Sequence, residues 1–201
     1  MDEFVSFGSR AYATCFLVLL LGRGMDFLST WVATPNLVLE GNPIAKRLGW
    51  HWGILLNLAV CVLLSFWPVS AIAVSTTSVL VAARNFQSAW LMRSLGEEVY
   101  RDWHVARIQE TRVTLYLFCL AGNTLLTAAV GGAVILFSGR LLVPFAIGLG
   151  IIAYAVAVAF YTLLATWRLR RSGLQPRRRL DPVRHEYQGD EALSRLNRIE
   201  Y

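Results

Sequence analysis

The sequence has few of the residues from which soluble catalytic and metal sites are built. Only 16% of its 201 residues are charged, against roughly 25% in ordinary globular domains. Its three cysteines, Cys15, Cys61 and Cys119, form no C-x-x-C motif and fall inside apolar runs. Neither a disulfide framework nor a zinc site is therefore predicted, and we interpret the cysteines as small core residues. We expect no metal and no cofactor.

Short enzyme motifs are also missing. There is no G-x-x-x-x-G-K-[ST] phosphate loop, no H-E-x-x-H zinc helix and no G-x-S-x-G elbow. The three histidines, His51, His104 and His185, are scattered, and Asp26 is the only acid inside an apolar run. An intramembrane pair of catalytic acids is therefore disfavoured, although the pattern neither singles out nor rules out a serine nucleophile. We expect a protein that is not an enzyme.

Long apolar runs dominate what is present. Hydrophobic residues make up 56% of the chain and the mean hydropathy is +0.49, which burial in a bilayer explains. A helix needs about 20 apolar residues to span roughly 30 Å of hydrocarbon. Five such runs occur, at residues 11–33, 50–66, 69–92, 113–137 and 141–167. The predicted fold is all-α, a polytopic membrane helix bundle with about five transmembrane helices.

Lysine and arginine in the short loops predict the orientation. Lys46, Arg47 and four arginines between residues 93 and 112 fall on one side if five spans alternate, together with an arginine-rich tail. The acidic N-terminus, residues 1–10, and the uncharged Trp67-Pro68 turn fall on the other side. Because basic loops stay in the cytoplasm, we expect the N-terminus outside and the C-terminus inside.

A cytoplasmic amphipathic segment is predicted near residues 95–112. Gly96 is expected to end one helix, and Glu97 suits the first turn of the next, where a negative charge is favoured. Its apolar residues recur at near-helical spacing, at Leu95, Val99, Trp103 and Ala106. The segment is expected to be an interfacial helix or a cytoplasmic extension of the fourth span.

Residues 168–201 form a basic tail that we expect to be cytoplasmic and largely disordered. Two interpretations stay open: a topology anchor, or contact with anionic inner-leaflet lipid at about 1 kcal/mol per basic residue. Nucleic acid is disfavoured because the block has no interleaved aromatic residues. The candidate lipid contacts are Arg168, Arg170, Arg171, Arg177, Arg178, Arg179 and Arg184.

Polar residues inside the apolar runs form the first candidate site. Arg23 and Asp26 share one helix face at i, i+3 spacing, where guanidinium and carboxylate can pair. With residues at similar depth they define a midplane set: Arg23, Asp26, Thr30, Asn57, Thr76 and Asn123. Ionisable groups in a span face the interior and mark functional sites, so this set predicts binding of an ion, a proton or a lipid headgroup. The alternative is a structural ion pair with interhelical hydrogen bonds worth about 0.6–2 kcal/mol each.

A second candidate lies in Glu40-Gly41-Asn42-Pro43. Asn42 suits an N-cap and Pro43 a first helical position, so the tetrapeptide predicts a helix start. The functional alternative is that Glu40, Asn42 and His51 bind a cation or a polar headgroup. The spacing Asp26-x-x-x-Thr30 followed by Glu40-x-Asn42-Pro43 resembles the DUF5658-type family of small prokaryotic membrane proteins of unknown function, over residues 20–66. This resemblance implies that these residues act together and that the protein is bacterial or archaeal; it implies no activity.

Small residues predict close helix contacts. Ala128 with Gly132 and Ala153 with Ala157 form small-x-x-x-small faces. Gly148 and Gly150 are expected to allow a bend or a close crossing in the fifth span, or a seam between copies of the chain.

Three functions stay open for this multi-pass protein of the cell membrane. The first, which the missing catalytic motifs favour, is a non-enzymatic interaction, assembly or accessory role, with a membrane protein or a second copy as partner; the other two are alternatives to it. The second is a small transporter or channel-like protein with a midplane polar site. The third is a lipid-modifying intramembrane enzyme. A sealed ion pair would favour the first, a wet midplane cavity the second, and a lateral cleft at Glu40 the third.

Overall fold

A computed structural model describes residues 4–38, 43–139 and 141–171. Within these ranges the chain forms helices and turns only, and the predicted all-α class is confirmed. The helices are α1 (Arg10–Ala33), α2 (Pro43–Leu64), α3 (Pro68–Leu95), α4 (Glu97–Glu110), α5 (Val113–Phe137) and α6 (Leu142–Arg171). In this part of the chain, every helix except α4 is long and apolar enough to cross a membrane, so the five predicted spans are confirmed.

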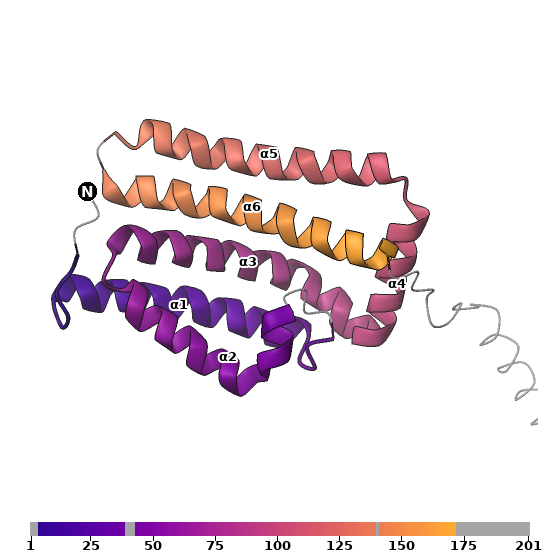
Figure 1. The fold of residues 1–201 in the computed structure, drawn as a ribbon, viewed down its shortest axis with the longest axis horizontal. Coiled ribbons are helices and arrows are strands. Elements are labelled where there is room, and N and C mark those ends of the chain that lie inside the picture. Colours follow the sequence, from indigo (N-terminus) through magenta and orange to yellow (C-terminus); the bar gives the residue numbers. More distant parts are fainter. Residues whose placement is uncertain (1–3, 39–42, 140, 172–201) are drawn as a thin grey trace, which may run out of the picture.

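The five long helices run side by side, and α4 lies across one end of the row (Figure 1). The broadest packing interfaces join α1 to α3, α3 to α6, and α6 to α5. Helix α2 has smaller contacts, with α1 and with α3. In Figure 1, α2 ends beside the start of α3, at the turn that connects them, and the rest of α2 diverges from α3. Among the five long helices, α2 therefore has the smallest packing contacts, and it lies beside the middle of α1.

A small buried core lies where α1, α2 and α3 approach one another. It contains Cys15, Leu19, Cys61 and Ala71, so the prediction for two of the three cysteines is confirmed. The prediction for Cys119 is wrong, because this side chain is exposed on α5. Helix α5 is the outermost of the row, and among its residues only Gly131 is buried. Its outward surface is apolar, as a lipid-facing surface must be.

Local residues explain where the helices break. The Trp67-Pro68 pair separates α2 from α3 as predicted, with Pro68 in the first turn of α3. Gly96, with φ of 80°, ends α3 and precedes α4. Gly49, with φ of 65°, kinks α2, so the part that begins at Trp50 has a different direction from the first turn.

Glycines allow close crossings on α6, as predicted. A Cβ on Gly150 would lie 2.5 Å from the carbonyl oxygen of Ala73 on α3. A Cβ on Gly148 would lie 2.7 Å from the carbonyl oxygen of Gly131 on α5. The predicted face through Gly132 makes no such contact, because nothing lies within 4 Å of a Cβ built there. One residue turns a helix by about 100°, which places Gly131 toward α6 and Gly132 away from it.

Helix α4 begins at Glu97, as predicted, and contacts α3 and α6. Its buried residues are Val105 and Ile108. The expected apolar face is therefore not the packed one, since Val99 and Trp103 are 40% and 39% exposed. The alternative of an extension of the fourth span is wrong, because the extended backbone at Arg112 separates α4 from α5.

The basic tail begins inside a helix. α6 continues to Arg171, past the predicted boundary at residue 167. Three of the candidate lipid contacts, Arg168, Arg170 and Arg171, therefore lie in its last turn, where Arg171 stacks 5.1 Å from the centre of the Trp167 ring. The other four, Arg177, Arg178, Arg179 and Arg184, lie outside the described residues.

Candidate functional site

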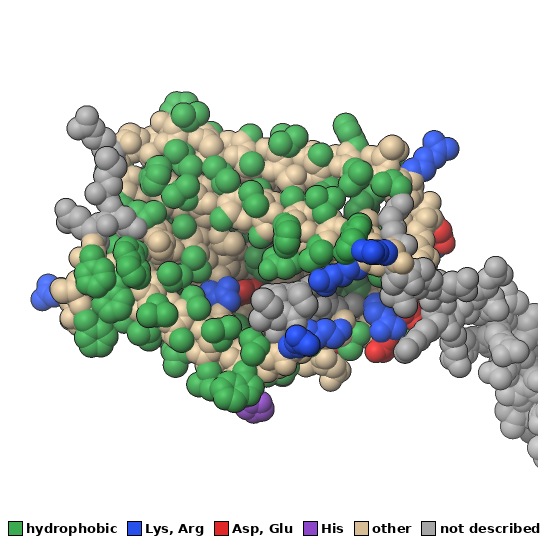
Figure 2. Space-filling view, in the orientation of Figure 1, with side chains coloured by type: hydrophobic (Ala, Val, Ile, Leu, Met, Phe, Trp, Pro, Cys, Tyr) green, Lys and Arg blue, Asp and Glu red, His purple; other side chains and the backbone are tan. Residues whose placement is uncertain are grey.

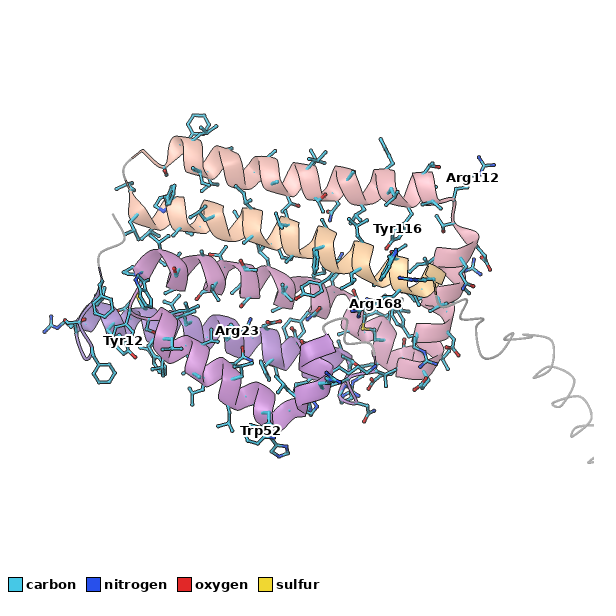
Figure 3. The ribbon with its side chains drawn as sticks, in the orientation of Figure 1. Tyr12, Arg23, Trp52, Arg112, Tyr116 and Arg168 are labelled. Carbon is cyan, nitrogen blue, oxygen red and sulfur yellow. The ribbon has the colours of Figure 1, made fainter. Side chains whose placement is uncertain are left out.

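Arg23, in the middle of α1, is the centre of a hydrogen-bonded network (Figure 3). Its Nη1 lies 3.1 Å from Asp26 Oδ2, in the predicted ion pair, and donates to Ser78 Oγ on α3 at 3.1 Å. Its Nε donates to Asn57 Oδ1 on α2 at 2.6 Å, and Nη2 donates to the same oxygen. One guanidinium thus joins three helices.

This network satisfies a cation that would otherwise be costly inside a membrane span. A guanidinium has five N–H donors and no acceptor, so its neighbours must supply oxygen atoms. Asp26, Asn57 and Ser78 supply them. Asn57 is held in place by its own Nδ2, which donates to the carbonyl oxygen of Gly53 at 2.8 Å. The predicted convergence of Arg23, Asp26 and Asn57 is thus found.

A second polar contact joins α1 and α3 close to the ion pair. Asn85 Nδ2 on α3 lies 3.2 Å from Ser29 Oγ and 3.3 Å from Thr30 Oγ1 on α1. Both hydroxyls also donate to the backbone carbonyl oxygen of Asp26, at 2.8 and 2.9 Å. Thr30 therefore lies beside the ion pair, as predicted, and the polar side chains continue along α1 for more than one turn.

A cavity of about 730 Å³ lies beside this network, with lining residues from α1, α2, α3 and α6 and, at one end, from α4 and from Tyr116 of α5. Its size is within the range of ligand sites, roughly 300–1,000 Å³. Polar lining comes from Arg23, Asp26, Asn57, Arg84, Asn85 and Thr162, and apolar lining from Leu56, Val60, Val81 and Val158. The ion pair is not sealed, since the side chains of Arg23 and Asp26 are 27% and 19% exposed.

The ion pair is visible from one face of the molecule. In Figure 2 a basic and an acidic side chain are visible together in the middle of the molecule, at the level where Figure 3 labels Arg23. Hydrophobic side chains cover much of this face, and Lys and Arg side chains gather toward its α4 end. A polar interior is thus exposed on a face that is largely apolar away from the α4 end.

Glu97 holds the α1–α2 connection against the α4 end of the cavity. Its carboxylate accepts hydrogen bonds from Thr34 Oγ1 at 2.6 Å, from the backbone N–H groups of Asn36 and Val38 at 3.0 and 3.1 Å, and from Asn36 Nδ2 at 3.1 Å. Partial burial alone would raise the pKa of this carboxyl, but the hydrogen bonds outweigh it and hold the pKa below its ordinary value. Thr34 and Leu37 also line the cavity, so Glu97 fixes part of its wall.

Some residues predicted to join the midplane set do not. Thr76 lies on the α3 face that packs on α6, where its Oγ1 donates to the Ile72 carbonyl oxygen at 2.8 Å. Asn123 is exposed on α5, and α3 and α6 lie between α5 and α1. Both expectations were wrong because depth along a span sets the height of a side chain but not the side of the helix on which it lies.

The second candidate site receives no support from the described residues. His51 is exposed, and it is not among the residues that line the cavity. The expected partners of His51, Glu40 and Asn42, lie outside the described residues. Helix α2 does begin at Pro43, as the tetrapeptide predicts.

Comparisons with protein-family models, with curated proteins and with solved structures give no match for this chain. The resemblance of residues 20–66 to the family of small prokaryotic membrane proteins therefore stays a prediction. Of the residues that carry it, Asp26, Thr30 and Pro43 are described: Asp26 and Thr30 lie one turn apart on α1, and Pro43 begins α2.

Sequence reasoning missed three polar residues of the site. Ser78 was not in the predicted midplane set, yet its hydroxyl accepts a hydrogen bond from Arg23. Arg84 and Asn85 were overlooked, although both lie within α3 and line the cavity. The rule that drew attention to Arg23, an ionisable residue within a span, would also have found Arg84.

Proposed function

We propose that the protein is a small transporter-like membrane protein that binds a polar or amphipathic molecule in the cavity beside Arg23. The supporting observation is the partly exposed Arg23–Asp26 pair in the wall of a cavity of ligand size. A pair that served packing alone would be enclosed by other side chains. The cavity thus favours the second of the three functions over a purely structural or accessory role.

An intramembrane enzyme has less support. Among the described lining residues, Asp26 is the only carboxylate and it is paired with Arg23. Acid–base chemistry on a lipid would need a second positioned acid or base near it. His104 lines the α4 end of the cavity, and burial lowers the pKa of its imidazole.

We further propose that the end of the row occupied by α4 is cytoplasmic. Basic residues gather there: Arg93 lies in the last turn of α3, Arg101 and Arg107 lie on α4, and Arg112 and Arg168 are labelled at the same end in Figure 3. The bias of lysine and arginine toward cytoplasmic loops supports this orientation. Because Leu169 and His104 line the cavity, one end of the cavity then lies on the cytoplasmic side.

The test is the reactivity of a cysteine in the cavity. Thr162 lines the cavity, whereas Phe160, two residues earlier on α6, is 59% exposed on the outside. We would introduce Thr162→Cys and Phe160→Cys separately into a variant with Cys15, Cys61 and Cys119 replaced by alanine. The protein is purified in mild detergent, stripped of lipid, and treated with an anionic methanethiosulfonate.

We expect Thr162→Cys to react and Phe160→Cys to stay unmodified, because the detergent belt excludes the charged reagent from the outer surface. Equal resistance of both cysteines would mean that polar molecules do not enter the cavity, and the proposed function would then be abandoned. The cysteine-free parent shows the background labelling, and its gel-filtration profile shows whether the fold is intact.

A further inference from the structure

The cavity contains one more positive than negative charge among its described lining residues. Arg23 is matched by Asp26 at 3.1 Å. Arg84 also lines the cavity, and no hydrogen bond or ion pair holds its guanidinium among the described residues. Desolvation lowers the pKa of His104, the remaining basic group of the described lining, below its ordinary value, which disfavours a further positive charge there. The cavity is thus suited to a ligand with a negative charge.

The position of Arg84 strengthens this conclusion. It lies eleven residues before the end of α3, which corresponds to about 16 Å along the helix. A cation at that depth without a partner is costly, so it needs a counter-charge or access to water. Asn85, beside it, and Thr162 on the facing wall add an amide and a hydroxyl within the same cavity.

The rest of the lining is apolar. Leu56 and Val60 on α2, Val81 on α3 and Val158 on α6 provide surface that a hydrocarbon chain can contact. The ion pair is visible on a face of the molecule that carries many hydrophobic side chains (Figure 2). A ligand that combines a charged head with an apolar chain would satisfy both parts of the lining.

We propose that the cavity binds the phosphate headgroup of an anionic membrane lipid and that Arg84 is the residue that recognises the phosphate. A guanidinium is matched to phosphate because its parallel N–H groups can donate to two oxygens at once. The charge of Arg23 is balanced by Asp26. Arg84 is therefore the residue that would favour a negatively charged ligand. This inference depends on the proposed function, since it names the ligand of the same cavity.

Protection of Thr162→Cys from the anionic methanethiosulfonate tests the inference. The lipid-free protein is incubated with dihexanoyl phosphatidic acid, with dihexanoyl phosphatidylcholine or with inorganic phosphate, and the modification rate is divided by the rate without ligand. We expect phosphatidic acid to protect the cysteine, and the other two to leave the rate unchanged. In the Arg84→Gln variant, the concentration of phosphatidic acid that gives half protection should rise about tenfold, because a charge-assisted hydrogen bond is lost.

Arg93→Gln is the matched control. It removes the same charge from the same helix, but Arg93 is exposed in the last turn of α3 and is not among the cavity-lining residues. Protection in this variant should equal that of the parent. Because Arg84 and Arg93 are both exposed, neither change is expected to unfold the protein.

Three results would overturn the inference. Equal protection by phosphatidylcholine would show that the negative charge is not recognised. Equal protection by inorganic phosphate would assign the site to a soluble phosphate instead of a lipid. Unchanged protection in Arg84→Gln would show that Arg84 only reaches toward the membrane surface. In each case Thr162→Cys still reacts without ligand, so the proposed function is judged separately.

Discussion

Arg23 on α1 donates from Nε to Oδ1 of Asn57 on α2 at 2.6 Å, and this hydrogen bond joins α2 to the rest of the row at the depth of the cavity. Helix α2 has otherwise small packing contacts and diverges from α3. A polar side chain thus holds in place a helix that forms part of the cavity wall.

Replacing Asn57 with leucine should loosen α2. The change removes the acceptor of two guanidinium N–H groups, and hydrogen bonds between transmembrane helices are worth up to about 2 kcal/mol. We expect a loss of about 1–2 kcal/mol, measured as a lower Tm of the purified protein in detergent. Leu58→Ala, at the next position of α2 where the side chain is 44% exposed, is the control. A Tm equal to that of the parent would show that the hydrogen bond does not stabilise the fold.

The carboxylate of Glu97 should make stability depend on pH. Its pKa is lowered in the folded protein relative to about 4.3 in the unfolded chain, so its stabilising effect is complete above that value. The effect is lost as the pH falls through the folded pKa. We expect Glu97→Gln to unfold at a lower temperature than the parent at pH 7, and this difference to shrink as the pH is lowered below 4.

Glu98→Gln is the control for Glu97. Glu98 is the next residue of α4, but its side chain is 63% exposed and forms an ion pair with Arg101 at the surface of the helix. An exposed ion pair contributes little to stability, so the Tm of this variant should stay close to that of the parent. If both glutamines lower the Tm equally, the hydrogen bonds from Thr34, Asn36 and Val38 are not the reason.

A methyl group at Gly150 should disturb the crossing of α3 and α6. The new Cβ would lie 2.5 Å from the Ala73 carbonyl oxygen and 2.6 Å from Thr76 Cβ, so the helices must move apart. Overpacking of this kind costs about 1–3 kcal/mol. Gly132→Ala meets nothing within 4 Å and gains helix propensity, so it should leave the Tm unchanged or raise it. If Gly150→Ala unfolded at the same Tm as the parent, the close crossing of α3 and α6 would be contradicted.

Reporter fusions check the proposed orientation. Alkaline phosphatase folds only outside the cytoplasm, so a fusion at the C-terminus should be inactive, whereas a fusion after Ser138 should be active. The reason is that α6 separates these two points by one membrane crossing. Activity at the C-terminus together with inactivity after Ser138 would reverse the orientation.

Much of the fold was predictable because a membrane places strong demands on composition. The spans, the Trp67-Pro68 break and the helix change at Gly96 follow from apolar run length and from the local conformational limits of proline and glycine. The Arg23–Asp26 pair followed in the same way, since i, i+3 spacing on one helix fixes the relative positions of two side chains.

Contacts between helices were predicted less well. Asn57 was placed correctly by depth, whereas Asn123 at similar depth is on the outermost helix and Thr76 faces α6. In water the apolar face of a helix shows which side is buried, but in lipid both sides are apolar. The sequence pattern therefore did not show how each helix is rotated about its axis, or which polar residues of other helices lie beside its own.

The sequence by itself determined that this is a helical protein with five membrane-length spans, and that Arg23 and Asp26 share one face of the first. The tertiary structure alone decided that Ser78 and Asn57 complete the shell of Arg23, that Glu97 holds the α1–α2 connection, and that Arg84 lines a cavity without a partner among the described residues. The physical reason is that run length and local spacing act within one helix. Which helices become neighbours depends on the close approach of small residues and on hydrogen bonds between residues far apart in the chain.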